Sequence, residues 1–172
     1  MAISPDERFA YRQLSFLHGF VEFDLRQGKP RPGRHPAALR GGQDAAAFAH
    51  HGIAMNPQGT KLCVAGTMSD AAIVRRDSFA HTTLASGEKP DWATNSADGR
   101  HCFVSASGDD KVTVNSYAEE RVVATIPVGD HPQRMRTGVI RAEYLPAGAT
   151  ATRRRASPAR GCSARRRAAC CA

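Results

Sequence analysis

The sequence predicts an all-β chain in which one four-stranded unit is repeated about three times. Residues 56–64 match residues 96–104 at a shift of 40, and residues 4–11 match residues 96–103 at a shift of 92. A period of about 40–45 residues is typical of the blades of a β-propeller. We therefore predict a partial β-propeller of about three four-stranded antiparallel blades, with repeats at residues 2–48, 50–90 and 91–132.

The third repeat shows the strand pattern most clearly, with strands expected at residues 92–95, 101–105, 111–115 and 121–128. At residues 111–115 valine alternates with polar residues, which is the two-residue period of a half-buried strand. The breaks between strands contain Asp98-Gly99 and Gly108-Asp109-Asp110. Because Asp and Gly both suit tight turns, these acids are interpreted as turn residues and not as a catalytic acid–base pair.

The amino-acid sequence of this repeat resembles that of a known family. Val112-Thr113-Val114-Asn115-Ser116, followed by the strand and turn at residues 121–132, is similar to the YVTN-type β-propeller repeat. The resemblance implies a fold and leaves the activity open, and intact members of the family are often periplasmic or extracellular. The first repeat fits less well, because Arg12 stands at an expected core position. Residues 28–36 are so rich in Pro and Gly that a loop is expected there in place of a last strand.

The formal charge of +8 is concentrated at the end of the chain. Residues 137–172 contain eight Arg and one Glu, which gives this segment a charge of +7. From about residue 147 it lacks apolar periodicity, so we predict a disordered tail that follows a folded domain of residues 1–136. Nonspecific binding of nucleic acid is expected from its two Arg clusters, which comprise Arg153, Arg154, Arg155, Arg165, Arg166 and Arg167.

The spacing of the five cysteines indicates no particular disulfide pairing or metal site. Cys63 and Cys102 occupy apolar strand positions and are predicted to be buried free thiols. The other three lie in the tail, where their spacing matches neither a metal site nor a disulfide pattern. No stretch has the features of a signal peptide or the roughly 18 apolar residues of a membrane helix. The cell compartment therefore stays open.

Candidate binding residues lie where the chain enters each blade, because propellers commonly bind ligands around the mouth of the central channel. The repeat register places His51, Asp91-Trp92 and Arg134 at equivalent points of successive units. With their neighbours, the candidates are His50, His51, Asp91, Trp92, His131 and Arg134. This set suits an anionic or aromatic ligand. No metal or cofactor is predicted, since the spacing carries no zinc signature and no haem-attachment motif.

The main functional interpretation is a non-enzymatic binding or scaffold module. Because three blades cannot close a ring, we expect a truncated or frameshifted remnant of a larger propeller. The alternative is a propeller enzyme or redox-cofactor protein, lactonase-like or haem-associated, in which His51, Asp91 and His131 would be ligands or bases. The sequence contains no Gly-rich phosphate loop, nucleophile elbow or zinc-protease helix. The ligand, which can be a protein or a small molecule, stays open.

Overall fold

The computed structural model describes residues 1–14, 19–31, 52–66, 70–138 and 140–144. Contacts divide the chain into two units, Met1–Gly138 and Val139–Ala172. The second unit is described only at residues 140–144, which include the short 3₁₀ helix η1 (Ala142–Tyr144). In the described part of the chain, no helix is long and apolar enough to cross a membrane. The predicted disordered tail and its two Arg clusters lie outside the described residues.

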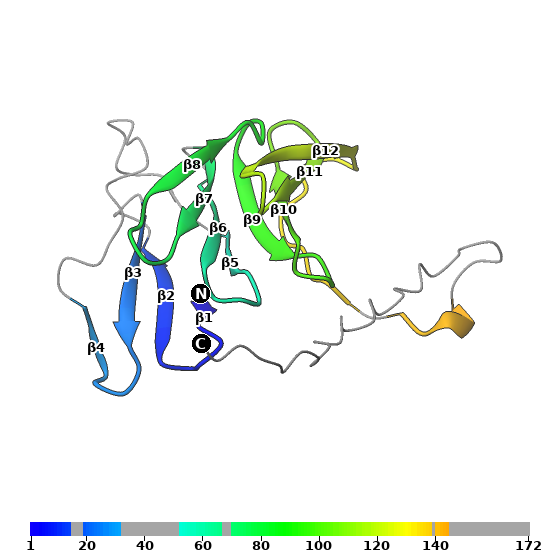
Figure 1. The fold of residues 1–172 in the computed structure, drawn as a ribbon. Coiled ribbons are helices and arrows are strands. Elements are labelled where there is room, and N and C mark those ends of the chain that lie inside the picture. The colour runs from blue at the N-terminus through cyan, green and yellow to red at the C-terminus, as the bar shows by residue number, and fades with distance from the viewer. Residues whose placement is uncertain (15–18, 32–51, 67–69, 139, 145–172) are drawn as a thin grey trace, which may run out of the picture. The chain divides into compact units, whose positions relative to one another are not determined.

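The first unit consists of three four-stranded antiparallel sheets, which we call blades 1, 2 and 3 (Figure 1). Blade 1 contains β1 (Ala2–Ile3), β2 (Phe9–Leu14), β3 (Gly19–Asp24) and β4 (Lys29–Pro30). Blade 2 contains β5 (Gly52–Met55), β6 (Lys61–Ala65), β7 (Ala71–Arg75) and β8 (His81–Leu84). Blade 3 contains β9 (Pro90–Asn95), β10 (His101–Ala106), β11 (Lys111–Ser116) and β12 (Arg121–Pro127). Within each sheet, strands that follow one another in sequence pair with each other, and the predicted all-β class is confirmed.

The prediction of a loop at residues 28–36 is wrong for the first residues of that range. Lys29 and Pro30 form the short strand β4, which pairs with Asp24 and Phe23 of β3. Proline is tolerated because β4 is an edge strand, where the missing amide donor need not serve a second neighbour. The amide of Arg31 extends the pairing by donating to the carbonyl of Glu22 at 2.9 Å.

The turns that follow the first strands repeat the same chemistry. The side chain of Ser4 accepts from the amide of Phe9 at 2.9 Å, and Ser96 accepts from the amide of His101 at 3.1 Å. In blade 2 the Oδ1 atom of Asn56 accepts from two amides instead, those of residues 60 and 61. Because the turns match, the rim loops of adjacent blades lie together, and Gln58 and Gly99 line one pocket there.

Two apolar cores lie between the blades, and side chains alternate between them. From β6, Leu62 and Val64 face blade 1, whereas Cys63 and Ala65 face blade 3. The core between blades 1 and 2 also contains Phe9, Tyr11, Phe20, Ile53, Met55, Val74 and Phe79. The core between blades 2 and 3 also contains Ile73, Leu84, Ala93, Cys102, Val104 and Tyr117. Blade 2 is therefore covered on both faces.

Cys63 and Cys102 form a disulfide bond, so the prediction of free thiols is wrong. The two residues are 39 positions apart, one fewer than the local repeat of 40. This offset places Cys63 on the face of blade 2 that looks toward blade 3, and Cys102 on the opposing face of blade 3. Their Cα atoms are 6.4 Å apart, which is within the range that a disulfide can bridge. The bond fastens the two blades through their second strands.

At the rim, the Glu120 carboxylate joins blade 3 to blade 2. It lies 2.8 Å from Lys61 Nζ and 3.4 Å from Arg75 Nε, and Thr82 Oγ1 donates to it at 2.7 Å. The hydrogen bond from Lys61, followed by the one from Thr82, lowers the pKa of Glu120 from its usual 4.5 to about 2.

Stability should therefore fall in acid partly through Glu120. A carboxyl group with a lowered folded-state pKa stabilises the fold above its unfolded pKa and loses that contribution as pH falls toward the folded value. We expect a loss of about 1 kcal/mol from this cluster between pH 5 and pH 2. Urea unfolding should show a smaller acid loss in Glu120→Gln than in the parent. Glu119→Gln is the control, because Glu119 is exposed and pairs within its own turn. An equal acid loss in both variants would contradict the assignment.

Candidate functional site

A pocket of about 550 Å³ lies where the chain enters blade 3, and we call it the Trp92 pocket. Its lining residues are Met1, Arg12, Gln13, Asp91, Trp92, Gln133 and Arg134. The structure thus brings together three of the residues that the repeat register places at equivalent points, Asp91, Trp92 and Arg134. Their role in ligand binding remains a prediction.

Residues 133–137 run beside β9 and hold Arg134 at the pocket. Ser105 Oγ donates to the carbonyl of Gln133 at 2.7 Å, and Thr137 Oγ1 donates to the carbonyl of Asn95. The hydrogen bond from Thr137 has a counterpart between blades 3 and 2. There Asn95 Nδ2 of β9 donates to the carbonyl of Met55 in β5 at 2.6 Å. The segment therefore occupies the place that the first strand of a next blade would have.

Two guanidinium groups lie over the indole ring of Trp92. The Cζ atoms of Arg134 and Arg136 are 5.4 and 5.1 Å from the ring centroid, which is within cation–π range. Arg12, which lines the pocket together with Arg134, adds a third positive charge. Burial, followed by repulsion from Arg12 and Arg136, lowers the pKa of the Met1 amino group. The surroundings of Trp92 are therefore electropositive.

Two of the lining residues carry a polar atom that is buried without a hydrogen-bond partner. Among the described residues, these include Trp92 Nε1, which is a donor, and Gln13 Oε1, which is an acceptor. The other end of the Gln13 amide donates to the carbonyl of Ala65 at 3.3 Å, which fixes its orientation. An unsatisfied buried polar group costs about 1–3 kcal/mol.

The remaining candidates do not join this pocket in the described structure. His131 is exposed, has a φ of 51°, and donates its amide to Asp110 Oδ1 at 2.9 Å. It is not among the residues that line the Trp92 pocket. His50 and His51 lie outside the described residues. Within the described ranges, no group of three His, Cys, Asp or Glu side chains is placed to hold a metal ion.

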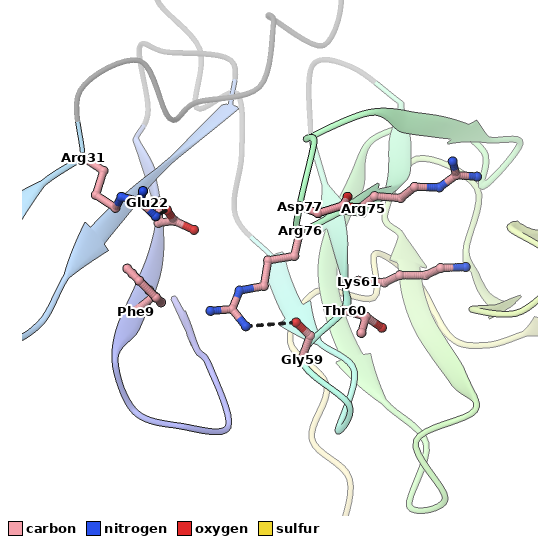
Figure 2. A pocket seen from close by; sticks show the side chains of 9 residues that line it. All are labelled: Phe9, Glu22, Arg31, Gly59, Thr60, Lys61, Arg75, Arg76 and Asp77. Carbon is pink, nitrogen blue, oxygen red and sulfur yellow. Dashed lines mark hydrogen bonds and ion pairs between the residues drawn. The ribbon is translucent and has the colours of Figure 1, made fainter.

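A second pocket, of about 450 Å³, lies between blades 1 and 2 and was missed by sequence reasoning (Figure 2). It is lined by Phe9, Glu22, Arg31, Gly59, Thr60, Lys61, Arg75, Arg76 and Asp77. The guanidinium groups of Arg31 and Arg76 each lie 5.3 Å from the centroid of the Phe9 ring. The sequence signal was Glu22, a charged residue between Val21 and Phe23 in the middle of a strand.

The charged groups of the second pocket are engaged in holding the blades together. The buried Glu22 carboxylate accepts from Tyr11 Oη at 2.6 Å and from Arg31 Nη1 at 2.9 Å. Arg76 of blade 2 donates to Tyr11 Oη at 2.6 Å. Burial and the bond to Glu22 raise the pKa of Tyr11. Figure 2 shows Lys61 and Arg75 extending away from Phe9. Both side chains pair with the Glu120 carboxylate of blade 3. This network is a link between blades, so the Trp92 pocket is the better candidate for a ligand.

No protein-family model and no curated protein matches the sequence. Solved structures do match. Kuenenia stuttgartiensis hydrazine synthase matches 76% of this chain and 35% of its own, with a TM-score of 0.63 and 21% identity. The Cps50 (Swd1) β-propeller domain of Myceliophteria thermophila matches 76% of this chain and 41% of its own, with a TM-score of 0.60 and 12% identity.

The three sheets are β-propeller blades. A putative 6-phosphogluconolactonase from Bacteroides uniformis is a further similar structure, with a TM-score of 0.54, 16% identity, and coverage of 76% of this chain and 40% of its own. This chain spans less than half the length of these three structures. At these identities the likeness shows the propeller fold alone.

Proposed function

We propose that this chain is a YVTN-type β-propeller module that binds a small anion in the Trp92 pocket without transforming it. The sequence at residues 112–116 and 121–132, which resembles the YVTN repeat, supports membership of the YVTN type. The propeller fold supports the placement of the site, because propellers commonly bind ligands where loops between blades converge.

The observation that carries the proposal is the combination of charge and unsatisfied polar atoms around one aromatic ring. Arg12, Arg134 and Arg136 supply positive charge. Trp92 Nε1 offers a donor and Gln13 Oε1 offers an acceptor. A carboxylate or phosphate would pair with the arginines, since charge-assisted hydrogen bonds are the strong ones. A hydroxyl group on the same molecule would satisfy the donor and the acceptor.

Binding is favoured over catalysis by the kind of groups that line the pocket. Asp91 is the one carboxylate among its described lining residues, and the others are Arg, Gln, Trp and Met. General acid–base chemistry needs a group that accepts or donates the proton at the reacting atom. The lactonase-like or haem-associated alternative would use His51, Asp91 and His131, and of these Asp91 alone is among the described residues that line the pocket.

Fluorescence offers a direct test, because Trp92 is the only tryptophan in the chain. Titration with citrate, gluconate or inorganic phosphate should give a saturable change in emission for at least one of them. Arg134→Gln should weaken that binding about tenfold or more, as expected for loss of a charge-assisted hydrogen bond. Arg121→Gln is the matched control, because Arg121 is exposed and pairs with Glu119. No saturable change with any of the three, by emission or by calorimetry, would contradict the proposal.

Nonspecific nucleic-acid binding by the tail remains a separate proposal. It rests on the Arg clusters at residues 153–155 and 165–167, which lie outside the described residues. Binding of this kind weakens steeply with salt, because it depends on counterion release. Arg134→Gln should leave affinity for single-stranded DNA nearly unchanged, which separates the tail from the Trp92 pocket.

A further inference from the structure

On the side away from blade 2, blade 3 has an apolar face that no described strand covers, and we call it the open face. The ladder pairs Phe103 with Val114 and Val112 with Ile126 on this side. Alternate residues of β10, such as Val104, point the other way and pack against blade 2. Phe103, Val112 and Val114 are only half-buried, and Ile126 is 44% exposed.

The same positions in blade 2 show what covers such a face. The matching ladder pairs there are Cys63 with Ile73 and Ala71 with Leu84. Each of these four residues is at most 1% exposed, because blade 3 lies over them. Blades 2 and 3 therefore present equivalent surfaces. The surface of blade 2 is covered by blade 3, and the surface of blade 3 is the open face.

The inner edge of the open face already carries one strand-like segment of a next blade. Thr137 contacts the carbonyl of Asn95 in β9, in the way that Asn95 contacts the carbonyl of Met55 in β5, and Ser105 of β10 donates to the carbonyl of Gln133. Among the described residues, no second strand pairs with this segment. An extended backbone with a free hydrogen-bonding edge is a template for β-strand addition.

We propose that the open face binds an antiparallel β-sheet from a different polypeptide, which takes residues 133–137 as its innermost strand and so forms a fourth blade. The partner's contacting side should carry small and aliphatic residues, as blade 3 presents Ala93, Cys102 and Val104 to blade 2. Burial of alternate apolar residues supplies the affinity, and backbone pairing to residues 133–137 sets the register.

A second copy of this chain is disfavoured as the occupant for two reasons. It would have to present the outer face of its own blade 1, where Arg12 is exposed beside the short strand β1. Arg12 would then approach Arg134 and Arg136, and like charges repel. Strand β1 would also compete with residues 133–137 for the same position along β9.

The proposal can be tested in the full chain by supplying a fourth blade in sequence. A second copy of residues 96–127 is inserted after Thr137, with all later residues retained. In the copy, Cys102 is changed to Leu, which is the residue at the matching position 62. We expect amide exchange in β11 and β12 to slow at least tenfold and the urea midpoint of unfolding to rise. The control insertion carries Val104→Glu in the copy, which puts a charge on the contacting side.

Two outcomes would overturn the proposal. One is that both insertions leave exchange in β11 and β12 unchanged or slow it equally, because the open face would then not recognise a sheet. The other is that the parent chain forms a defined dimer in sedimentation that Ile126→Lys abolishes, because the occupant would then be a second copy. A monomeric parent together with protection by the first insertion alone would support it.

Discussion

Replacement of Cys63 and Cys102 by alanine should lower the free energy of unfolding by about 4 kcal/mol, from the entropy of closing a loop of this length. The bond joins residues 39 apart and is fully buried between blades 2 and 3. Two small cavities in the same core would add to the loss. Urea unfolding of the parent and the double variant, each with and without reductant, measures the effect.

The parent should lose stability on reduction, whereas the double variant should not respond. Cys162→Ala is the control, since Cys162 belongs to the segment after residue 147 that lacks apolar periodicity. Thiol labelling under denaturing conditions gives an independent measure, because Cys63 and Cys102 should be protected until a reductant is added. Free labelling of both residues in the unreduced chain would show that the bond is absent.

The strands and turns of the blades could be predicted from the sequence, because the sequence repeat indicates where each of them lies. In blade 3 the expected strands at residues 92–95, 101–105, 111–115 and 121–128 differ from the observed ones by two residues or fewer at each end. The alternation at residues 111–115 predicts which side chains of β11 share a face, and the turns use side chains that accept backbone amides, as Ser96 does. It does not predict which face is buried, because Thr113 and Asn115 are buried whereas the two valines are only half-buried. Local rules therefore suffice for the strands and turns, and the packing of the blades decides the burial.

The disulfide could not be predicted, because it depends on how neighbouring blades face each other. A buried cysteine in a strand is compatible with a free thiol when only its own strand is considered. The one-residue offset between Cys63 and Leu62, the residue that matches Cys102, becomes meaningful only once the blades are stacked. Strand β4 was missed for a related reason, since its two residues owe their conformation to pairing with β3.

The candidate site was predicted in part. The register brings Asp91, Trp92 and Arg134 into one pocket, because equivalent positions of stacked repeats must be neighbours. Arg12 stands at an expected core position, where a charged residue is a departure from the repeat, and it is exposed and lines the same pocket. A charge is tolerated there because the described residues place no blade against that side of blade 1. Arg136 and Gln13 were not predicted, since their roles depend on contacts between distant segments.

Substitution of Gly52 by alanine should separate blades 2 and 3 at their inner strands and cost about 3 kcal/mol or more, at the upper end for overpacking. A Cβ atom at Gly52 would lie 2.2 Å from the Ala93 nitrogen and 2.5 Å from the Trp92 Cα atom. Both are backbone atoms of β9, so no side-chain rotation can relieve the contact.

The same substitution should disturb the Trp92 pocket, because β9 carries the indole ring. We expect a shift in Trp92 emission in the folded variant as well as a lower urea midpoint. Gly129→Ala is the matched control, since a Cβ atom there meets nothing within 4 Å and its φ is not positive. It should be neutral or slightly stabilising through its effect on the unfolded chain. If Gly52→Ala were as stable as Gly129→Ala, the close packing of β5 against β9, and with it the placement of Trp92 at the start of blade 3, would be wrong.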